Sequence, residues 1–347
     1  MILSEEARCW MNFLAHPFEY VAAFPVTNPS QVDACCAGKE EFAQVEHLYA
    51  RIELLAQSAL QEGLENYVRE AAAKGEPGRY HDLIHRQVYD GLIHCELERL
   101  TRLGLIPTFT PQWMTRLPLG SFALQFTFVL EKPWFSKDDV AFYPIDNPVR
   151  KEKLFKVPVM SSAAAKGLLR WTVRMEKGLI AHLEKDPNME KWKDDAQTLR
   201  LFGTPKGERD PSRFRAGRLA TYPTFFNRIE LEVINPHDRK TRAGTKPILY
   251  EVVPAGANGT FSLLYVPFDR IGQDVLETRR EMVEDLQLLG RALFSLMCLY
   301  GFSAKRTAGW GAAADQFAEG TVGRIWFQDG THWTFTAISD IASLARQ

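Results

Sequence analysis

Residues 121–130 read SFALQFTFVL, an aromatic-rich stretch in which large apolar side chains alternate with smaller or polar ones. Such alternation is typical of a β-strand with one buried face. Residues 106–120, just before it, contain three prolines and are interpreted as a linker. The stretch therefore predicts the first strand of a sheet that begins near residue 120.

The elements that follow predict the fold class. Residues 161–176 and 274–300 have helical spacing of apolar residues. Strand-like pieces lie at residues 218–221, 228–234, 248–253, 260–266, 309–317 and 324–327. The order strand, helix, strands, helix, strand predicts an α+β fold, a ferredoxin-like (RRM-like) sheet with helices on one face.

The first part of the chain has a different character. Residues 40–73 and 80–103 carry apolar side chains near helical spacing, which predicts an α-helical N-terminal region over 1–115 and a second domain over 116–347. Residues 1–115 hold 9 Lys and Arg against 16 Asp and Glu, whereas residues 116–347 hold 33 against 27. Any contact with phosphate groups is therefore expected in the second domain.

Composition limits the class of protein. The chain has 347 residues and a net charge of −1, so it is no general binder of polyanions. Five cysteines without paired spacing argue against a disulfide framework. The sequence has no apolar run long enough to span a membrane and no recognisable signal peptide, so we expect a cytoplasmic protein without membrane contact.

Two motifs of the second domain suit an anionic ligand. Residues 301–311 read GFSAKRTAGWG, in which glycines allow close approach of a ligand and Lys305 and Arg306 supply charge. Residues 161–170 read SSAAAKGLLR, which predicts a helix with Lys166 and Arg170 on one face. The alternatives are a helix cap followed by a turn for the first motif and an ordinary amphipathic helix for the second.

Two loops and one helix offer further candidates. Asp146 lies in the turn-forming stretch 143–151, YPIDNPVRK, and alone indicates only a surface turn. Residues 235–246 are basic and lie between two predicted strands, which fits a solvated turn or an arm that reaches nucleic acid. His81 and His85, four residues apart on a predicted helix, allow the alternative of a zinc-dependent hydrolase, although Asp82 stands where that motif has Glu.

Taken in order, these pieces resemble the RAMP superfamily, the ferredoxin-like RNA-binding subunits of type III (Csm/Cmr-like) CRISPR effector complexes. The resemblance covers about residues 120–317 and leaves the first 115 outside. It rests on five stretches in the right order: the strand 121–130, the Ile-Asp-Asn-Pro-Val at 145–149, Lys166-Gly167 with Arg170, the Leu-Phe-Gly at 201–203, and the glycine-rich 301–311. One departure is that alanines stand at 163 and 164, where the family has serines.

The resemblance implies a role for each motif. Asp146 would be the catalytic residue of an endoribonuclease that cuts target RNA with a divalent cation, Mg²⁺ or Mn²⁺, and the RNA 2′-hydroxyl. The stretch 235–246 would be a thumb hairpin. The implied RNA-binding residues are Lys166, Arg170, His237, Arg239, Lys240, Arg242, Lys246, Lys305, Arg306, Gly309 and Gly311.

The resemblance therefore implies a backbone-type subunit of a ribonucleoprotein for antiviral defence. Its partners would be CRISPR RNA as guide, target RNA and other effector subunits in a hetero-oligomer. Base pairing between guide and target would read the sequence. A non-catalytic structural or capping subunit of the same complex is the alternative, and the helical region 1–115 would then be small-subunit-like or a docking surface.

Overall fold

The computed structural model describes residues 13, 15–58, 61, 63–69, 80, 83–84, 88–140, 143–205, 207–208, 210–235, 244 and 247–344. The chain forms two compact units, each assembled from separate stretches. Unit 1 comprises Met1–Glu98, Phe135–Pro158 and Asn227–Pro254, and unit 2 comprises Arg99–Trp134, Val159–Phe226 and Ala255–Gln347. The predicted division at residue 115 follows the chain instead, and it stays a prediction.

Unit 2 contains a five-stranded antiparallel sheet with the strand order β3-β7-β1-β8-β9. Its strands are β1 (Phe122–Val129), β3 (Leu219–Thr221), β7 (Asn258–Tyr265), β8 (Gly323–Phe327) and β9 (His332–Phe335). Helix α10 (Ser162–Glu176) lies between β1 and β3 in the chain, and α13 (Val275–Phe294) lies between β7 and β8. The α+β class is thereby confirmed.

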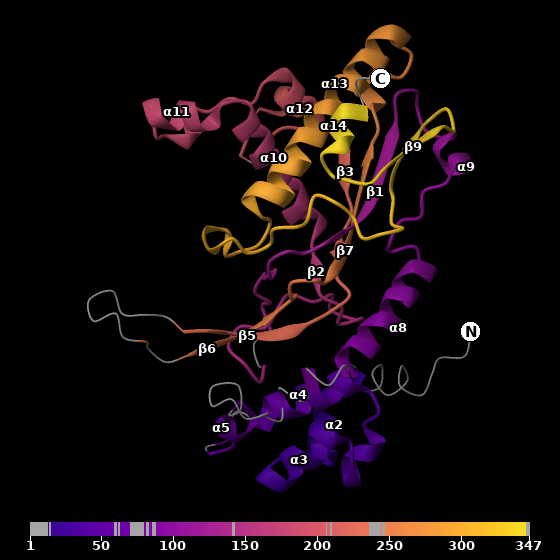
Figure 1. The fold of residues 1–347 in the computed structure, drawn as a ribbon. Coiled ribbons are helices and arrows are strands. Elements are labelled where there is room, and N and C mark those ends of the chain that lie inside the picture. Colours follow the sequence, from indigo (N-terminus) through magenta and orange to yellow (C-terminus); the bar gives the residue numbers. More distant parts are fainter. Residues whose placement is uncertain are drawn as a thin grey trace. The chain divides into compact units, whose positions relative to one another are not determined.

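The two long helices pack together, and each has an N-cap residue at its start. Figure 1 shows α10 and α13 side by side, and they are in contact. The Ser161 hydroxyl accepts a hydrogen bond from the amide of Ala164 at 3.2 Å, and Asp274 caps α13 in the same way. Ala165, Leu169 and Val173 are buried at helical spacing, so α10 turns an apolar stripe inward.

The alternation that predicts β1 also builds the core of unit 2. Phe122, Leu124, Phe126 and Phe128 lie on one face of the strand and are almost fully buried. The ring of Phe122 stacks on that of Tyr265 with centroids 4.8 Å apart. Because side chains alternate between the faces of a strand, the large aromatic residues all contribute to one core.

The prediction of a linker over residues 106–120 was wrong. The stretch contains α9 (Pro111–Met114), where Thr110 is the N-cap and Pro111 begins the helix. Phe109 and Met114 are buried against Ala123 and Trp326. Pro111 begins a helix rather than marking a connector, and the segment covers apolar residues of β1 and β8.

The remaining elements of unit 2 are short. The helices are α11 (Leu179–Lys185), α12 (Ala196–Phe202) and α14 (Asp340–Leu344). Strands β2 (Val159–Met160) and β4 (Thr224–Phe225) form a separate pair. A π-helix, η5 (Ser295–Tyr300), continues α13, and single 3₁₀ turns are η2 (Met189–Lys191), η3 (Pro211–Arg213), η4 (Phe268–Arg270) and η6 (Arg306–Ala308).

Unit 1 combines short helices with one hairpin. The helices are α2 (Pro17–Ala23), α3 (Pro29–Ala37), η1 (Glu40–Gln44), α4 (Leu48–Ser58) and α5 (Leu64–Arg69). The boundary between the units falls within α8 (Val88–Arg102). Strands β5 (Glu230–Ile234) and β6 (Ile248–Val252) pair antiparallel, and Figure 1 shows them as a two-stranded arm. No helix in the described part is both long and apolar enough to cross a membrane.

Candidate active site and nucleic-acid interface

Asp146 lies at the exposed apex of the loop 143–151 in unit 1. The residues on either side of it are mostly buried: Tyr143, Pro144, Ile145, Pro148 and Val149. The carbonyl of Asn147 accepts a hydrogen bond from the amide of Glu251 at 2.9 Å, and the Asn147 side chain donates to the carbonyl of Leu249 at 3.2 Å. The loop is therefore bound along β6 and exposes its single aspartate.

A buried carboxylate, Glu251 of β6, joins both arms of this loop. Its Oε1 accepts hydrogen bonds from the hydroxyls of Tyr143, at 2.6 Å, and of Tyr80. Its Oε2 accepts from the amide of Val149, at 3.1 Å, and forms an ion pair with the ammonium of Lys151. The side chains of Lys151 and Glu251 are 1% and 0% exposed. Such an ion pair is stable only when its remaining donors and acceptors are satisfied, as they are here.

Tyrosines surround this ion pair. Burial, together with the charge of Glu251, raises the pKa of Tyr80 and of Tyr143 well above the usual value. Both hydroxyls therefore stay protonated and act as hydrogen-bond donors to the carboxylate. The ring of Tyr143 packs against that of Tyr80 at a centroid distance of 5.9 Å. The loop that carries Asp146 consequently begins at a tyrosine whose ring is packed against another tyrosine.

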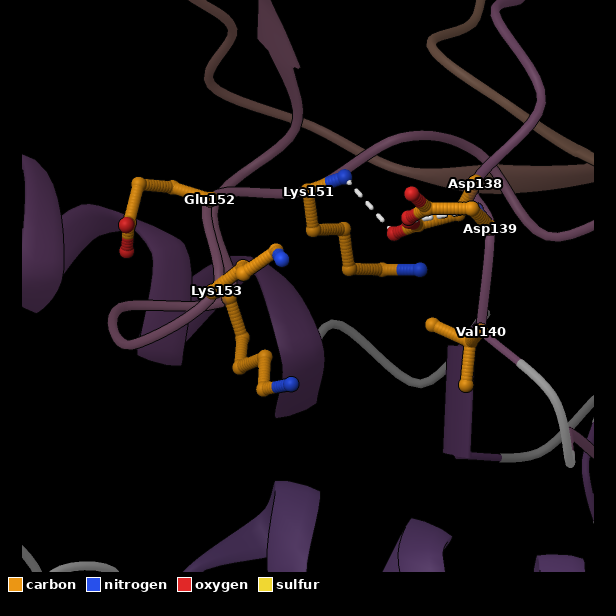
Figure 2. A pocket seen from close by; sticks show the side chains of 7 residues that line it. Asp138, Asp139, Val140, Lys151, Glu152 and Lys153 are labelled. Carbon is orange, nitrogen blue, oxygen red and sulfur yellow. Dashed lines mark hydrogen bonds between the residues drawn. The ribbon is translucent and has the colours of Figure 1, made fainter.

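A pocket of about 310 Å³ lies beside the loop. Its lining includes Asp138, Asp139, Val140, Lys151, Glu152, Lys153 and Lys156. Figure 2 shows the carboxylate of Asp138 directed at the main chain of Lys151, whose amide donates to it at 3.1 Å. Burial lowers the pKa of Lys156, whose ammonium lies 4.3 Å from the centre of the Tyr49 ring. Three carboxylates lie against three lysines, one of which, Lys151, is already paired with Glu251, so the pocket does not select an anion by charge.

Unit 2 brings together two of the predicted RNA-binding motifs. The guanidinium of Arg306, in the glycine-rich stretch, lies 4.5 Å from the centre of the Trp171 ring on α10. Tyr300 packs edge-on against the same ring at 5.2 Å. Lys305 lies 6.0 Å from the ring of Trp310. Residues about 135 positions apart therefore contribute to one surface that combines cations with aromatic rings.

The two predicted cations of α10 have partners within unit 2. Arg170 forms an ion pair with Asp194 at 2.6 Å and donates to the carbonyl of Gly203. The ammonium of Lys166 donates to the carbonyl of Leu219 at 2.6 Å, and burial, followed by the charge of Arg170, lowers its pKa. Both side chains thus hold α10 to its neighbours, and a contact with RNA would use the atoms that remain accessible.

The glycines of these motifs serve different purposes. Gly309 is exposed, and a methyl group added there would meet nothing within 4 Å, as is also true of Gly167 on α10. A methyl group at Gly311 would lie 2.6 Å from the amide nitrogen of Ser303. Gly309 and Gly167 therefore leave open space for a ligand, whereas Gly311 is required by packing.

Several predicted residues lie outside the described part of the chain. They are His81, His85, His237, Arg239, Lys240, Arg242 and Lys246. The stem of the hairpin that carries the last five is described as β5 and β6. Both the thumb contacts and the zinc alternative therefore stay predictions.

The loop of Asp146 does not by itself fit the divalent cation that the resemblance implies. Among the described residues, no three His, Cys, Asp or Glu side chains gather as metal ligands would. Within the loop, the carbonyl oxygen of Asn147 accepts a hydrogen bond from the Glu251 amide, and the side-chain NH2 of Asn147 donates to the carbonyl of Leu249. The cation stays a prediction without a preformed set of protein ligands.

Sequence reasoning missed Glu251, Lys151 and Trp171. Glu251 lies in the apolar stretch ILYEVV, residues 248–253, where a charged side chain is unusual and indicates a buried partner. Lys151 lies among the charged residues RKEK, and nothing in that pattern distinguishes it. Their pairing joins positions 100 residues apart, which no local pattern contains.

No family model matches the chain, and a search of curated proteins finds no relative. Two solved structures are similar in part. A chain of a type III-B Cmr-β complex bound to cognate target RNA aligns with a TM-score of 0.41 and 9% identity, over 94% of this chain and 99% of that one. A chain of a CRISPR RNA-guided surveillance complex aligns with a TM-score of 0.37 and 14% identity, over 59% and 68%. Similarity at this level carries no argument about fold or function.

Proposed function

We propose that this chain is an RNA-binding subunit of a type III-like CRISPR effector complex, built on a ferredoxin-like RAMP domain. The order of the central elements supports the domain assignment: β1, α10, β3, β7, α13 and β8 occur in the order β-α-β-β-α-β, with further short elements between them. In the sheet, β8 and β7 flank β1, and β3 lies beyond β7, a strand order that supports a ferredoxin-like domain. Strand β9 is an addition at the edge.

The observation that carries the proposal is the meeting of α10 with the glycine-rich stretch around Trp171. A cation beside aromatic rings suits the phosphates and bases of RNA. The open space at Gly167 and Gly309 allows a sugar-phosphate backbone to approach closely. These are the two motifs that the resemblance assigns to the guide RNA. The hairpin of β5 and β6 would contribute its basic tip, and the region 1–115 would contact neighbouring subunits.

We further propose that Asp146 acts in cleavage of the target RNA. Its exposed carboxylate would accept a hydrogen bond from the 2′-hydroxyl beside the scissile phosphate and orient that oxygen for attack on phosphorus. The attack transfers the proton of the 2′-hydroxyl to this carboxylate, breaks the bond between phosphorus and the 5′ oxygen, and produces a 2′,3′-cyclic phosphate. The leaving 5′ oxygen takes a proton from water and becomes a hydroxyl, and the carboxylic acid returns its proton to the solvent. Because the loop is fixed at both arms, the carboxylate would need little reorganisation.

The test compares cleavage by the guide-loaded complex, purified through a tag on this chain, with the wild-type residue or Asp146→Ala. We expect the substitution to remove one or more cuts while target binding is unchanged. Asp139→Ala, which removes another exposed carboxylate of unit 1, is the matched control and should cut normally. A target with a 2′-deoxy sugar at the cut site should resist cleavage.

Each outcome has a clear meaning. If all cuts persist with Asp146→Ala, the alternative of a structural or capping subunit replaces the cleaving one. If the tagged chain brings down no guide RNA, the assignment to a CRISPR complex is wrong. Sequencing of the co-purified RNA shows directly whether guide RNA is present.

A further inference from the structure

The exposed carboxylate of Asp146 depends on contacts made far from it in the sequence. Before the apex, the Tyr143 hydroxyl donates to Glu251 at 2.6 Å. After the apex, the Val149 amide donates to the other oxygen of the same carboxylate at 3.1 Å. The side chain of Glu251 therefore spans both arms of the loop. The main-chain amide of Glu251 adds a third hydrogen bond to the loop, at the carbonyl of Asn147.

The neighbouring charges determine how strongly this arrangement is held. Lys151 pairs with Glu251, and its ammonium also donates to the carbonyl of Val149 at 3.3 Å. The pair is excluded from water, so loss of either charge leaves the other buried without compensation. Glu251 also pairs with Leu231 across the β5–β6 hairpin, so the loop is anchored to the stem of the predicted thumb.

We propose that Glu251 is a positioning residue for RNA cleavage: it holds both arms of the loop 143–151 and so fixes the place of the Asp146 carboxylate. The inference rests on the proposed cleavage. Glu251 is fully buried and does not touch RNA. It acts by keeping the carboxylate of Asp146 aligned, and displacement of a reacting group by about 1 Å can slow a reaction about a hundredfold.

Two substitutions separate positioning from a general need for stability. Glu251→Gln keeps the size of the side chain but has one acceptor oxygen, so it cannot serve Tyr143 and Val149 together. It also leaves the Lys151 ammonium unpaired. The double variant Glu251→Gln with Lys151→Met removes that unpaired charge. It should regain thermal stability while the arms of the loop stay released.

The experiment measures three properties of the guide-loaded complex and the full chain. These are single-turnover cleavage at saturating target, target affinity, and hydrogen exchange of the amides in residues 143–151. For Glu251→Gln we expect cleavage slowed by about 10- to 100-fold, unchanged target affinity and faster exchange in the loop. For the double variant we expect recovered stability and cleavage that stays slow.

The matched control is Asp285→Asn on α13. Asp285 is also a buried carboxylate, which accepts from the Tyr265 hydroxyl at 2.8 Å and from Arg200. This variant should lose thermal stability yet cleave at the wild-type rate. Recovery of cleavage together with stability in the double variant would overturn the inference, as would unchanged loop exchange in Glu251→Gln.

Failure of the proposed cleavage gives a different result from failure of the inference about Glu251. If Asp146→Ala leaves every cut in place, the loop does not cleave RNA, and the proposed cleavage is wrong. Hydrogen exchange in Glu251→Gln then still decides whether Glu251 anchors the loop, because that measurement needs no cleavage.

Discussion

The loop 143–151 and the glycine-rich stretch 301–311 are both held tightly, but by different means. The first is bound through the side chain of Glu251, about 100 residues away. The second is held mainly by close packing of its own backbone, since a methyl group at Gly301 would lie 2.5 Å from the carbonyl oxygen of Trp310, and by one hydrogen bond from Gly311 to the carbonyl of Pro133. When glycines allow the backbone of a motif to pack closely, the residues that hold the motif lie within its own sequence. When a buried charge holds the motif, as Glu251 does here, the supporting residue lies elsewhere in the sequence.

Removal of the lysine that pairs with Glu251 should lower the stability of the chain the most. Lys151→Met leaves the carboxylate of Glu251 buried without its cation, which should destabilise the chain by about 3–5 kcal/mol. Denaturant unfolding of the full chain measures this. Lys153→Met, an exposed lysine of the same segment, should change stability little. Equal effects of the two substitutions would mean that the anchor is not needed.

In the glycine-rich stretch, substitution of Gly311 should destabilise the chain more than substitution of Gly309. Gly311→Ala places a methyl group 2.6 Å from Ser303 at a φ of +77°, so we expect a loss of about 3 kcal/mol. Gly309→Ala has a similar φ of +76° but open space, so about 1 kcal/mol should be lost. The difference between the two melting temperatures tests the packing argument, and it should vanish if φ alone matters.

Acid should weaken unit 2 through Asp194. Burial opposes the charge of this carboxylate, but hydrogen bonds from Arg174 and Arg170 outweigh it and lower the pKa to about 2. Because the folded pKa lies below the unfolded value of about 3.9, the stabilisation is complete above that pH and disappears as the pH falls toward 2. The difference in unfolding free energy between wild type and Asp194→Asn should shrink by about 2 kcal/mol over this range.

The smallest effect is expected on the proposed RNA surface. Arg306→Ala removes one cation beside Trp171 and should weaken RNA binding by the complex by about 1 kcal/mol, with a lower salt dependence. Arg280→Ala, an exposed arginine of α13, is the control and should leave binding unchanged. Filter binding at several salt concentrations measures both, and equal effects would mean general charge attraction rather than a site.

Much of unit 2 could be predicted from local patterns. The strand at 121–130 and the helix at 161–176 are confirmed nearly to the residue, because alternation and capping are local signals. The stretch 309–317, predicted as a strand, forms only isolated antiparallel bridges, from Ala313 to Leu130 and from Gln316 to Ala337. Gly309 and Gly311 both have positive φ, and the Gly311 amide bonds to the carbonyl of Pro133 instead of joining a ladder of strand pairs. The single helix predicted over 40–73 is divided into η1, α4 and α5 within its described part.

Local patterns predicted the α+β class, the order of the main strands and helices of unit 2, and the exposed turn at Asp146, since periodicity, caps and turn residues act over a few positions. No local pattern predicts that Arg170 pairs with Asp194, that Arg306 lies against Trp171, or that Glu251 supports the loop of Asp146. These contacts join residues between 24 and 135 positions apart. Desolvation and close packing select such partners, and both depend on segments that are far apart in the sequence coming together as the chain folds.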